Sequence, residues 1–207
     1  MARPVLTAAD VEALPAGGEV VLPRGALVTD QARELARERG VRIRLEESVD
    51  APGSSRHRPV VLAADHAGYE MKEHLKRLLL ESGYEVRDLG TDSTQPVDYP
   101  DFAAAAAQAV ASGAAWRGIV VDGAGIGSAM AANKVPGARA ALCYDATTAR
   151  NSREHNDANI LTLGSRMLTP DQASEIVRLW LETEFAGGRH QRRVDKLAAI
   201  ERRGLGR

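Results

Sequence analysis

A glycine-rich loop between a buried strand and a helix is the feature that most constrains this chain. Residues 119–121 are a short β-branched apolar run, typical of a buried parallel strand, and the run ends at Asp122. Gly123, Gly125 and Gly127 follow at alternate positions before a helical segment. Glycines let backbone N–H groups approach a ligand closely, and a helix start adds unpaired N–H donors and a positive dipole end. The pattern predicts a site for a phosphate or for an oxyanion that forms during a reaction.

The loop also allows two other interpretations. A glycine turn can serve only to let a helix pack tightly against a strand. A dinucleotide site needs the spacing G-x-G-x-x-G and an acidic residue about 20 residues later, whereas this loop has G-x-G-x-G. The spacing therefore disfavours a nucleotide-binding module. The place of Asp122 at the carboxyl end of a strand, where α/β proteins build their sites, favours a functional loop.

Short apolar runs alternate with helical patterns from residue 60 onward. We predict strands at residues 60–64, 84–89, 119–122, 138–143 and 159–163. We predict helices at residues 69–81, 102–111, 129–134, 145–153, 170–184 and 194–203. Such an alternation predicts an α/β domain with a doubly wound, parallel sheet of about five strands, covered on both faces through right-handed crossovers.

The first 45 residues form a separate, small α/β unit. We predict helices at residues 8–14 and 30–39 and strands at 19–22 and 41–45. Nothing in this unit has catalytic spacing, which favours a docking or oligomerisation extension. Residues 46–59 are rich in turn formers and lack apolar periodicity, as a linker does. The predicted organisation is an extension over 1–45, a linker over 46–59 and a main domain over 60–207.

Composition narrows the partners and the compartment. The chain has 27 Lys and Arg against 28 Asp and Glu, a net charge of −1, which excludes a general attraction to nucleic acid or an anionic membrane. Its single cysteine, Cys143, permits no intrachain disulfide and fits a reducing compartment. No stretch approaches the ~20 apolar residues of a membrane span, and the N-terminus has no secretory pattern. We therefore expect a soluble, cytoplasmic protein.

Polar side chains gather where the predicted strands end. Asp65 and His66 follow the first strand of the main domain, and Arg166 follows the fifth. Near the C-terminus, Arg189 and Arg193 are spaced i and i+4, so both guanidinium groups could reach one phosphate from a helix. These clusters indicate a site for a small anionic molecule.

Each cluster also has an ordinary structural explanation. An Asp-His pair often caps a helix, residues 153–157 could form a solvated loop, and a basic tail is often only a charged face. Metal binding by His66 and His155 is disfavoured because no H-x-x-x-H pattern or cysteine pair is present. A serine hydrolase is disfavoured because the G-x-S-x-G elbow is missing. We expect no metal and no cofactor.

Taken in order, these clusters resemble the ribose-5-phosphate isomerase B family, which includes the galactose-6-phosphate isomerase subunits. The matching stretches are residues 65–68, 97–100, 123–134, 152–159 and 184–190. The resemblance implies a Rossmann-like sheet and metal-free aldose–ketose isomerisation of a sugar phosphate. It also implies a homodimer or tetramer in which two subunits share each site.

The resemblance implies roles for the matching residues. His155 would help open the sugar ring, with Asn156 beside it, and both would come from the partner subunit. Asp65 and His66 would line the site, with His66 near the phosphate, and Tyr99 would flank the sugar. The backbone N–H groups that would hold the enediolate are those of Gly123, Gly125 and Gly127. The phosphate would be bound by Arg166, Arg189 and Arg193.

The chain departs from this family at the base. Many members have a cysteine at the position of Asp122 and a threonine at the position of Ala124, and another branch has a glutamate at the position of Ser128. We hypothesise that Asp122 removes the C2 proton, although a helix N-terminus stabilises its charged form and weakens it as a base. The predicted reaction interconverts ribose 5-phosphate and ribulose 5-phosphate through a cis-enediolate. Alternatives are another aldose phosphate, such as a hexose or deoxy sugar, and a catalytically weak sugar-phosphate-binding protein.

The N-terminal unit has a shorter resemblance of its own. Residues 23–29 and 32–41 are similar to extensions on some enzymes of bacterial microcompartments. This likeness implies association with shell proteins or cargo inside such a compartment. The other interpretation is an appendage that only stabilises the enzyme.

Overall fold

The computed structural model describes residues 5–22, 26–45 and 58–206. The chain divides into two compact units, residues 1–53 and residues 54–207. Residues 23–25 and most of the predicted linker, residues 46–57, lie outside the described residues.

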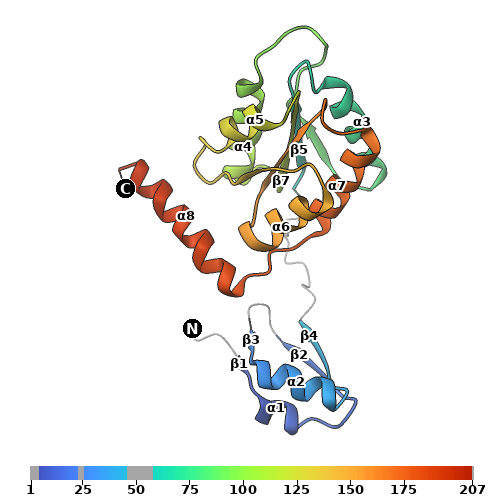
Figure 1. The fold of residues 1–207 in the computed structure, drawn as a ribbon, viewed down its shortest axis with the longest axis vertical. Coiled ribbons are helices and arrows are strands. Elements are labelled where there is room, and N and C mark those ends of the chain that lie inside the picture. The colour runs from blue at the N-terminus through green and yellow to red at the C-terminus, as the bar shows by residue number, and fades with distance from the viewer. Residues whose placement is uncertain (1–4, 23–25, 46–57, 207) are drawn as a thin grey trace. The chain divides into compact units, whose positions relative to one another are not determined.

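The larger unit is built on one parallel sheet (Figure 1). Its strands are β5 (Val60–Ala64), β6 (Val86–Asp88), β7 (Arg117–Asp122), β8 (Ala140–Leu142) and β9 (Ile160–Gly164). They lie in the order β6-β5-β7-β9-β8, and every neighbouring pair is parallel. The prediction of a doubly wound sheet of five parallel strands is confirmed. β7 is central and buried along its whole length, so its last residue, Asp122, enters the loop from a rigid support.

Helices cover both faces of this sheet. These helices are α3 (Tyr69–Glu81), α4 (Tyr99–Ala111), α5 (Ile126–Ala132), α6 (Ala146–Asn156) and α7 (Pro170–Glu182), and the chain then continues through the short 3₁₀ turn η2 (Gly188–His190) into α8 (Gln191–Gly204), which extends away from the sheet (Figure 1). α4 and α5 pack on one face through an alanine-rich core, whereas α3, α6 and α7 pack on the other face around larger side chains, including Leu75 and Trp180. Small alanine side chains let α4 lie close to the sheet, which brings its first residue, Tyr99, over the glycine loop.

Two helix boundaries differ from the predicted ones near the site. α5 begins at Ile126, three residues before the predicted start, because Gly125 adopts a left-handed conformation (φ 77°) and the Asp122 carboxylate accepts the first N–H groups. α6 continues to Asn156, where the prediction ended at residue 153. His155 and Asn156 therefore lie on the last helical turn.

The smaller unit contains two short parallel strand pairs and two helices. Its elements are β1 (Val5–Leu6), α1 (Ala8–Glu12), β2 (Glu19–Leu22), β3 (Leu27–Val28), α2 (Asp30–Glu38) and β4 (Arg42–Leu45). β1 pairs with β3 and β2 pairs with β4, around a core that includes Val11, Ala32 and Ala36. Thr29 caps α2 by accepting the Ala32 N–H at 3.2 Å. β1 and β3 were not predicted, since two residues give no periodic signal.

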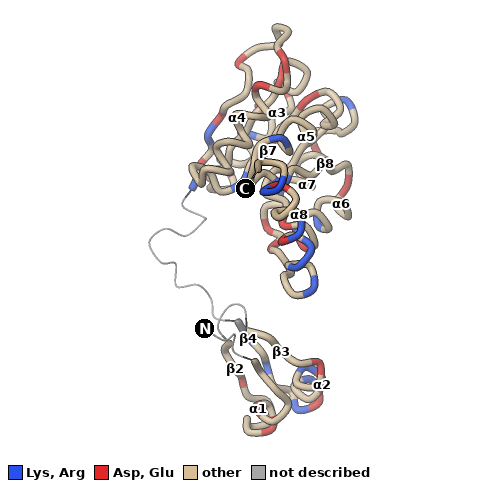
Figure 2. Tube along the Cα trace, turned by 90° about the vertical axis from the view of Figure 1, so that its left-hand side faces the viewer, with Lys and Arg blue, Asp and Glu red and all other residues tan. Residues whose placement is uncertain are grey.

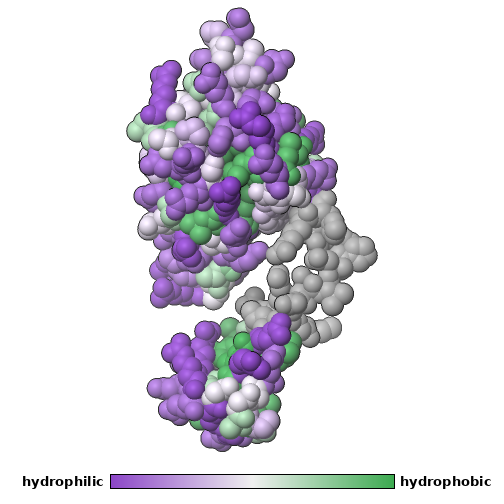
Figure 3. All heavy atoms as spheres, turned by 90° about the vertical axis from the view of Figure 1, so that its right-hand side faces the viewer, coloured by the Kyte–Doolittle hydropathy of each residue, from purple (hydrophilic) through white to green (hydrophobic). Residues whose placement is uncertain are grey.

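The surface of the larger unit is mixed in charge. Figure 2 shows basic residues recurring along α8, and its sequence places Arg192 and Arg193 in the first turn. On the side seen in Figure 3, apolar side chains reach the surface in one diagonal band between hydrophilic ones. No helix within the described ranges is long and apolar enough to cross a membrane.

Candidate active site

The glycine loop and its neighbours form one group of predicted site residues, at the carboxyl ends of β5, β7 and β9. Asp65 follows β5, is buried, and accepts the Gly68 N–H at 2.9 Å on Oδ1. His66 Nδ1 lies 3.1 Å from the Val97 carbonyl oxygen and 3.2 Å from the Val97 nitrogen. These contacts fix the two side chains to the loops beside the glycines.

The Asp122 carboxylate folds back onto its own loop. Oδ1 accepts the N–H groups of Ala124, at 2.8 Å, and of Gly125, and Oδ2 accepts the Ser128 N–H at 2.9 Å. The side chain is 5% exposed. Asp122 therefore caps α5, and it already occupies the Gly125 N–H, which we had predicted to hold the enediolate. That prediction is corrected, because a carboxylate three residues before Gly125 reaches its amide first.

Within the described ranges, the other two glycine amides stay available to a ligand. The N–H groups of Gly123 and Gly127 donate to no acceptor among the described residues. A Cβ added to Gly127 would lie 2.5 Å from the Tyr99 ring, and one added to Gly123 would lie 3.6 Å from Arg166 Nε. Tyr99 and Arg166 thus lie against the loop.

Tyr144 is a neighbour of the loop that sequence reasoning missed. Its hydroxyl donates to the Ala124 carbonyl at 2.9 Å, and its ring is 38% exposed. The signal was an aromatic residue just after the fourth strand of the sheet, β8. Tyr144 is thereby attached to the glycine loop through Ala124.

A second group of predicted residues lies around the end of α6 and the start of α8. His155 stacks on His190, with ring centroids 4.2 Å apart and an angle of 9° between the planes. The Asn151 amide lies 2.8 Å from His155 Nδ1, and Arg189 Nε donates to His190 Nε2 at 3.3 Å. Sequence reasoning missed His190, although it ends the last matching stretch.

This second group is strongly basic and reaches the surface. Asn156, Arg189 and Arg193 are exposed. Burial, followed by the positive charges of His155, Arg189 and Arg193, lowers the pKa of His190. Because cationic groups surround His190, this surface is suited to binding an anion such as a phosphate.

Within one copy of the chain, the two groups lie at opposite ends of the sheet. α6 leaves the carboxyl end of β8 and returns to the amino end of β9, so its last turn lies at the amino end. β9 has five residues, which separates the two ends by roughly 17 Å. Figure 1 shows α8 starting beside α6 at this end, away from α5. A single copy therefore does not bring His155 to Asp122.

The candidate metal ligands and the single cysteine lie apart from one another or in the core of the described chain. Among those residues, no three His, Cys, Asp or Glu side chains come together as metal ligands would. Cys143 is fully buried, and burial raises the pKa of its thiol. A buried protonated thiol is a core side chain rather than a nucleophile.

The larger unit matches known isomerases over nearly its whole length. Residues 60–197 match the model of the family described as "Ribose/Galactose Isomerase". The ribose-5-phosphate isomerase B of Escherichia coli K12 is 43% identical over 144 residues, which are 70% of this chain and 97% of that protein.

Solved structures give the same result. A ribose-5-phosphate isomerase B from Clostridium thermocellum is 51% identical, with a TM-score of 0.70, over 70% of this chain and 99% of that one. The enzyme from Mycoplasma genitalium, solved with bound ribulose-5-phosphate, is 39% identical with a TM-score of 0.68, over 70% and 97% of the two chains. The chain therefore belongs to the ribose/galactose isomerase family.

Proposed function

We propose that this protein interconverts ribose 5-phosphate and ribulose 5-phosphate. The proposal rests on one observation: this member of the family carries two groups of site residues whose chemistry is complementary. One group offers a carboxylate and free backbone N–H donors at a glycine loop, and the other offers an imidazole and two arginines. Together they supply a base, an oxyanion site, a ring-opening group and a phosphate site.

The complete site forms between two copies of the chain. Apolar side chains are exposed beside both groups. On α5 they are Ile126 (47% exposed) and Met130 (64%), and on α8 they are Leu197 (47%) and Ile200 (57%). The α8 side chains line a groove of about 830 Å³ that also contains Asn156. A twofold dimer that buries these faces against each other would complete two identical sites, because an isologous interface repeats every contact.

Asp122 is the base that moves the proton between C2 and C1. An ionised carboxylate has about four lone-pair sites, and three are filled by loop N–H groups, so one remains on Oδ2. The partner subunit's His155 gives a proton to the ring oxygen as the bond between C1 and that oxygen breaks, and the imidazole then takes up the C1 hydroxyl proton, which leaves the open aldehyde. Asp122 then removes the C2 proton, the Gly123 and Gly127 N–H groups hold the enediolate, and the proton returns to C1. The O2 hydroxyl proton ends on O1, which completes the ketose.

The phosphate is held away from the reacting carbons. The partner subunit's Arg189 and the partner subunit's Arg193 bind it with Arg166 and His66, while Asp65 and the partner subunit's Asn156 position the sugar. Binding energy from the phosphate thereby orients C1 and C2 against Asp122.

Ketose formation from a panel of aldose phosphates tests the proposal. We expect turnover of ribose 5-phosphate at a higher kcat/KM than turnover of six-carbon or deoxy aldose phosphates. Faster turnover of a hexose phosphate would assign another substrate. Thermal stabilisation by ribose 5-phosphate without any turnover would identify a binding protein and reject the isomerase.

We propose that the N-terminal unit docks the enzyme to a partner, and that shell proteins or other cargo of a bacterial microcompartment are that partner. The unit has its own core, none of the proposed site residues belongs to it, and the family match begins only at residue 60. Deletion of residues 1–45 should abolish co-purification with shell proteins and leave kcat unchanged. Equal co-purification of both forms would leave the unit as a stabilising appendage.

A further inference from the structure

A buried arginine pair lies beneath the group that carries His155. Arg117, at the start of β7, is 3% exposed and donates to the carbonyls of Trp180 at 2.7 Å, Leu181 at 2.8 Å and Thr183 at 3.2 Å. These carbonyls are the unpaired acceptors at the end of α7. Burial, and then the charge of Arg153, lower the pKa of Arg117 to about 10, so the group stays cationic at neutral pH.

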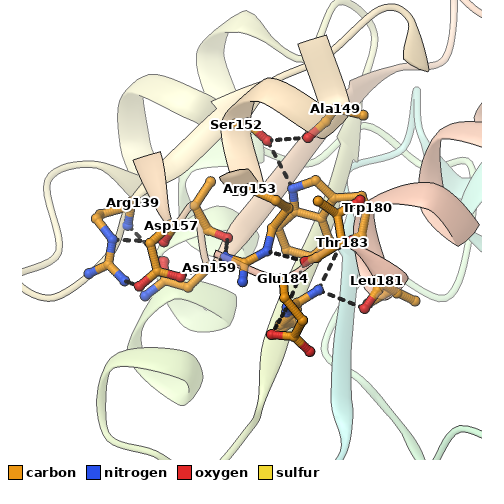
Figure 4. Close-up of polar contacts among 12 residues, drawn as sticks. Arg139, Ala149, Ser152, Arg153, Asp157, Asn159, Trp180, Leu181, Thr183 and Glu184 are labelled. Atoms are coloured by element: carbon orange, nitrogen blue, oxygen red, sulfur yellow. Dashed lines mark hydrogen bonds and ion pairs between the residues drawn. The ribbon is translucent and has the colours of Figure 1, made fainter. Parts of the chain in front are cut away.

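Arg153 joins the same carbonyl from the opposite side. It is 4% exposed, two residues before His155, and its Nε donates to the Thr183 carbonyl at 3.1 Å. Its Nη1 donates to Asp157 Oδ1 at 2.9 Å and to the Ala158 carbonyl at 2.5 Å. Figure 4 shows Arg153 between Asp157 and Thr183. One guanidinium thus connects the end of α6 to the end of α7.

Asp157 fixes the place at which α6 stops. It has a left-handed backbone (φ 47°, ψ 43°), which Asp adopts more readily than most residues. Arg139 donates two hydrogen bonds to this residue, from Nη2 to Asp157 Oδ2 and from Nε to the Asp157 carbonyl, both at 2.8 Å. Arg153 donates to Oδ1, so both carboxylate oxygens and the carbonyl of Asp157 accept hydrogen bonds from arginines. These bonds fix the position of Asn156 and His155, which directly precede Asp157.

The segment after α7 leads directly to the phosphate-binding arginines. The Ala186 N–H donates to the Glu154 carbonyl at 3.0 Å, which ties this segment to α6 once more. Two left-handed glycines, Gly187 and Gly188, then turn the chain into η2, where Arg189 stands. The contacts at Thr183 and Ala186 therefore set where Arg189 lies relative to His155.

We propose that Arg153 is a positioning residue that keeps the partner-facing imidazole of His155 at a fixed distance from Arg189. The inference rests on the proposed function, because only there do both residues meet one substrate. They would engage opposite ends of ribose 5-phosphate, the ring oxygen and the phosphate. A displacement of about 1 Å in such a pair can cost on the order of 10²-fold in rate.

The shape of the guanidinium is essential to this role. Arg153 donates in two directions from one rigid plane, whereas a lysine ammonium is a single point charge on a flexible stem. Arg153→Lys and Arg153→Met should therefore both lower kcat for ribose 5-phosphate by about 10- to 100-fold. Arg150→Met is the matched control, since Arg150 is exposed on the same helix, and it should keep kcat within about twofold.

A double-mutant cycle with His155→Ala separates positioning from general stability. If Arg153 acts through His155, Arg153→Met in the His155→Ala background should lower kcat by less than about threefold. Equal losses in both backgrounds, or an Arg153→Met single variant with unchanged kcat, would overturn the proposal. If Arg153→Met does not fold, Arg153→Lys, which keeps the charge, carries the same cycle.

A spectroscopic measurement keeps this inference distinct from the proposed reaction. The rings of His155 and His190 are stacked, so each should shift the imidazole C–H resonances of the other. The spectrum of His155→Asn, which loses one set of these resonances, assigns them. Arg153→Met and Arg153→Lys should move these resonances toward unstacked values, and Arg150→Met should not. Unchanged resonances in both Arg153 variants would overturn the positioning role, whether or not the wild type turns over ribose 5-phosphate.

Discussion

Replacing Asp122 by asparagine tests both roles that the structure gives this side chain. Its oxygens accept three loop N–H groups, two on Oδ1 and one on Oδ2. The amide of asparagine keeps one oxygen, which can stay with Ala124 and Gly125. Its NH₂ group must then face the Ser128 N–H, which leaves that buried donor without an acceptor and removes the proposed base.

The two losses have separate magnitudes. An unsatisfied buried donor costs about 1–3 kcal/mol, which lowers the melting temperature of a domain of this size by roughly 2–12 °C. Loss of a general base lowers kcat by about 10²- to 10⁴-fold. Asp171→Asn is the matched control, because Asp171 is exposed in the first turn of α7. It should change neither quantity appreciably.

Thermal unfolding and ribulose 5-phosphate formation measure the two effects on the same samples. Full kcat in Asp122→Asn would reject Asp122 as the base, even if the protein melts earlier. An unchanged melting temperature would show that the loop N–H groups do not depend on the carboxylate. The first result would contradict the catalytic role of Asp122, and the second would contradict its structural role in the loop.

Three further predictions follow from single contacts. Gly127→Ala should lower kcat/KM because its Cβ would lie 2.5 Å from the Tyr99 ring, and the loss should shrink in a Tyr99→Ala background. His190 has a lowered pKa in the fold, so the unfolded chain binds its proton more readily, and urea midpoints should fall as the pH drops through about 6.5, with a smaller fall in His190→Gln. Arg193→Met should lower kcat/KM for ribose 5-phosphate by about tenfold, because Arg193 binds the phosphate whose binding energy orients the reacting carbons.

Much of the fold follows from local patterns. The strand Val60–Ala64 and the helix Tyr69–Glu81 have the predicted bounds, since a continuous apolar run marks the first and Gly83 (φ 81°) ends the turn after the second. Glycine spacing also identifies the loop at Asp122. These features depend on residues that are close in sequence, so the amino-acid sequence alone is enough to predict them.

The arrangement of the site was harder to predict because it depends on side-chain direction and topology. The sequence indicates that Asp122 precedes a helix, but only the fold shows its oxygens taking the Gly125 and Ser128 N–H groups. Arg117 gave no signal at all, as a lone arginine before a strand is usually exposed. Arg153 was open to interpretation as part of a solvated loop, yet it is buried against Trp180.

The central claim is that two copies of this chain share each site, with Asp122 from one copy and His155 from the other. Mixing Asp122→Asn and His155→Ala subunits, each nearly inactive alone, under conditions that exchange subunits tests it directly. A random mixture in a twofold dimer restores one intact site in half of the dimers, so activity on ribose 5-phosphate should reach about a quarter of the wild-type value. A mixture that stays at the level of the separate variants after proven subunit exchange would contradict the claim.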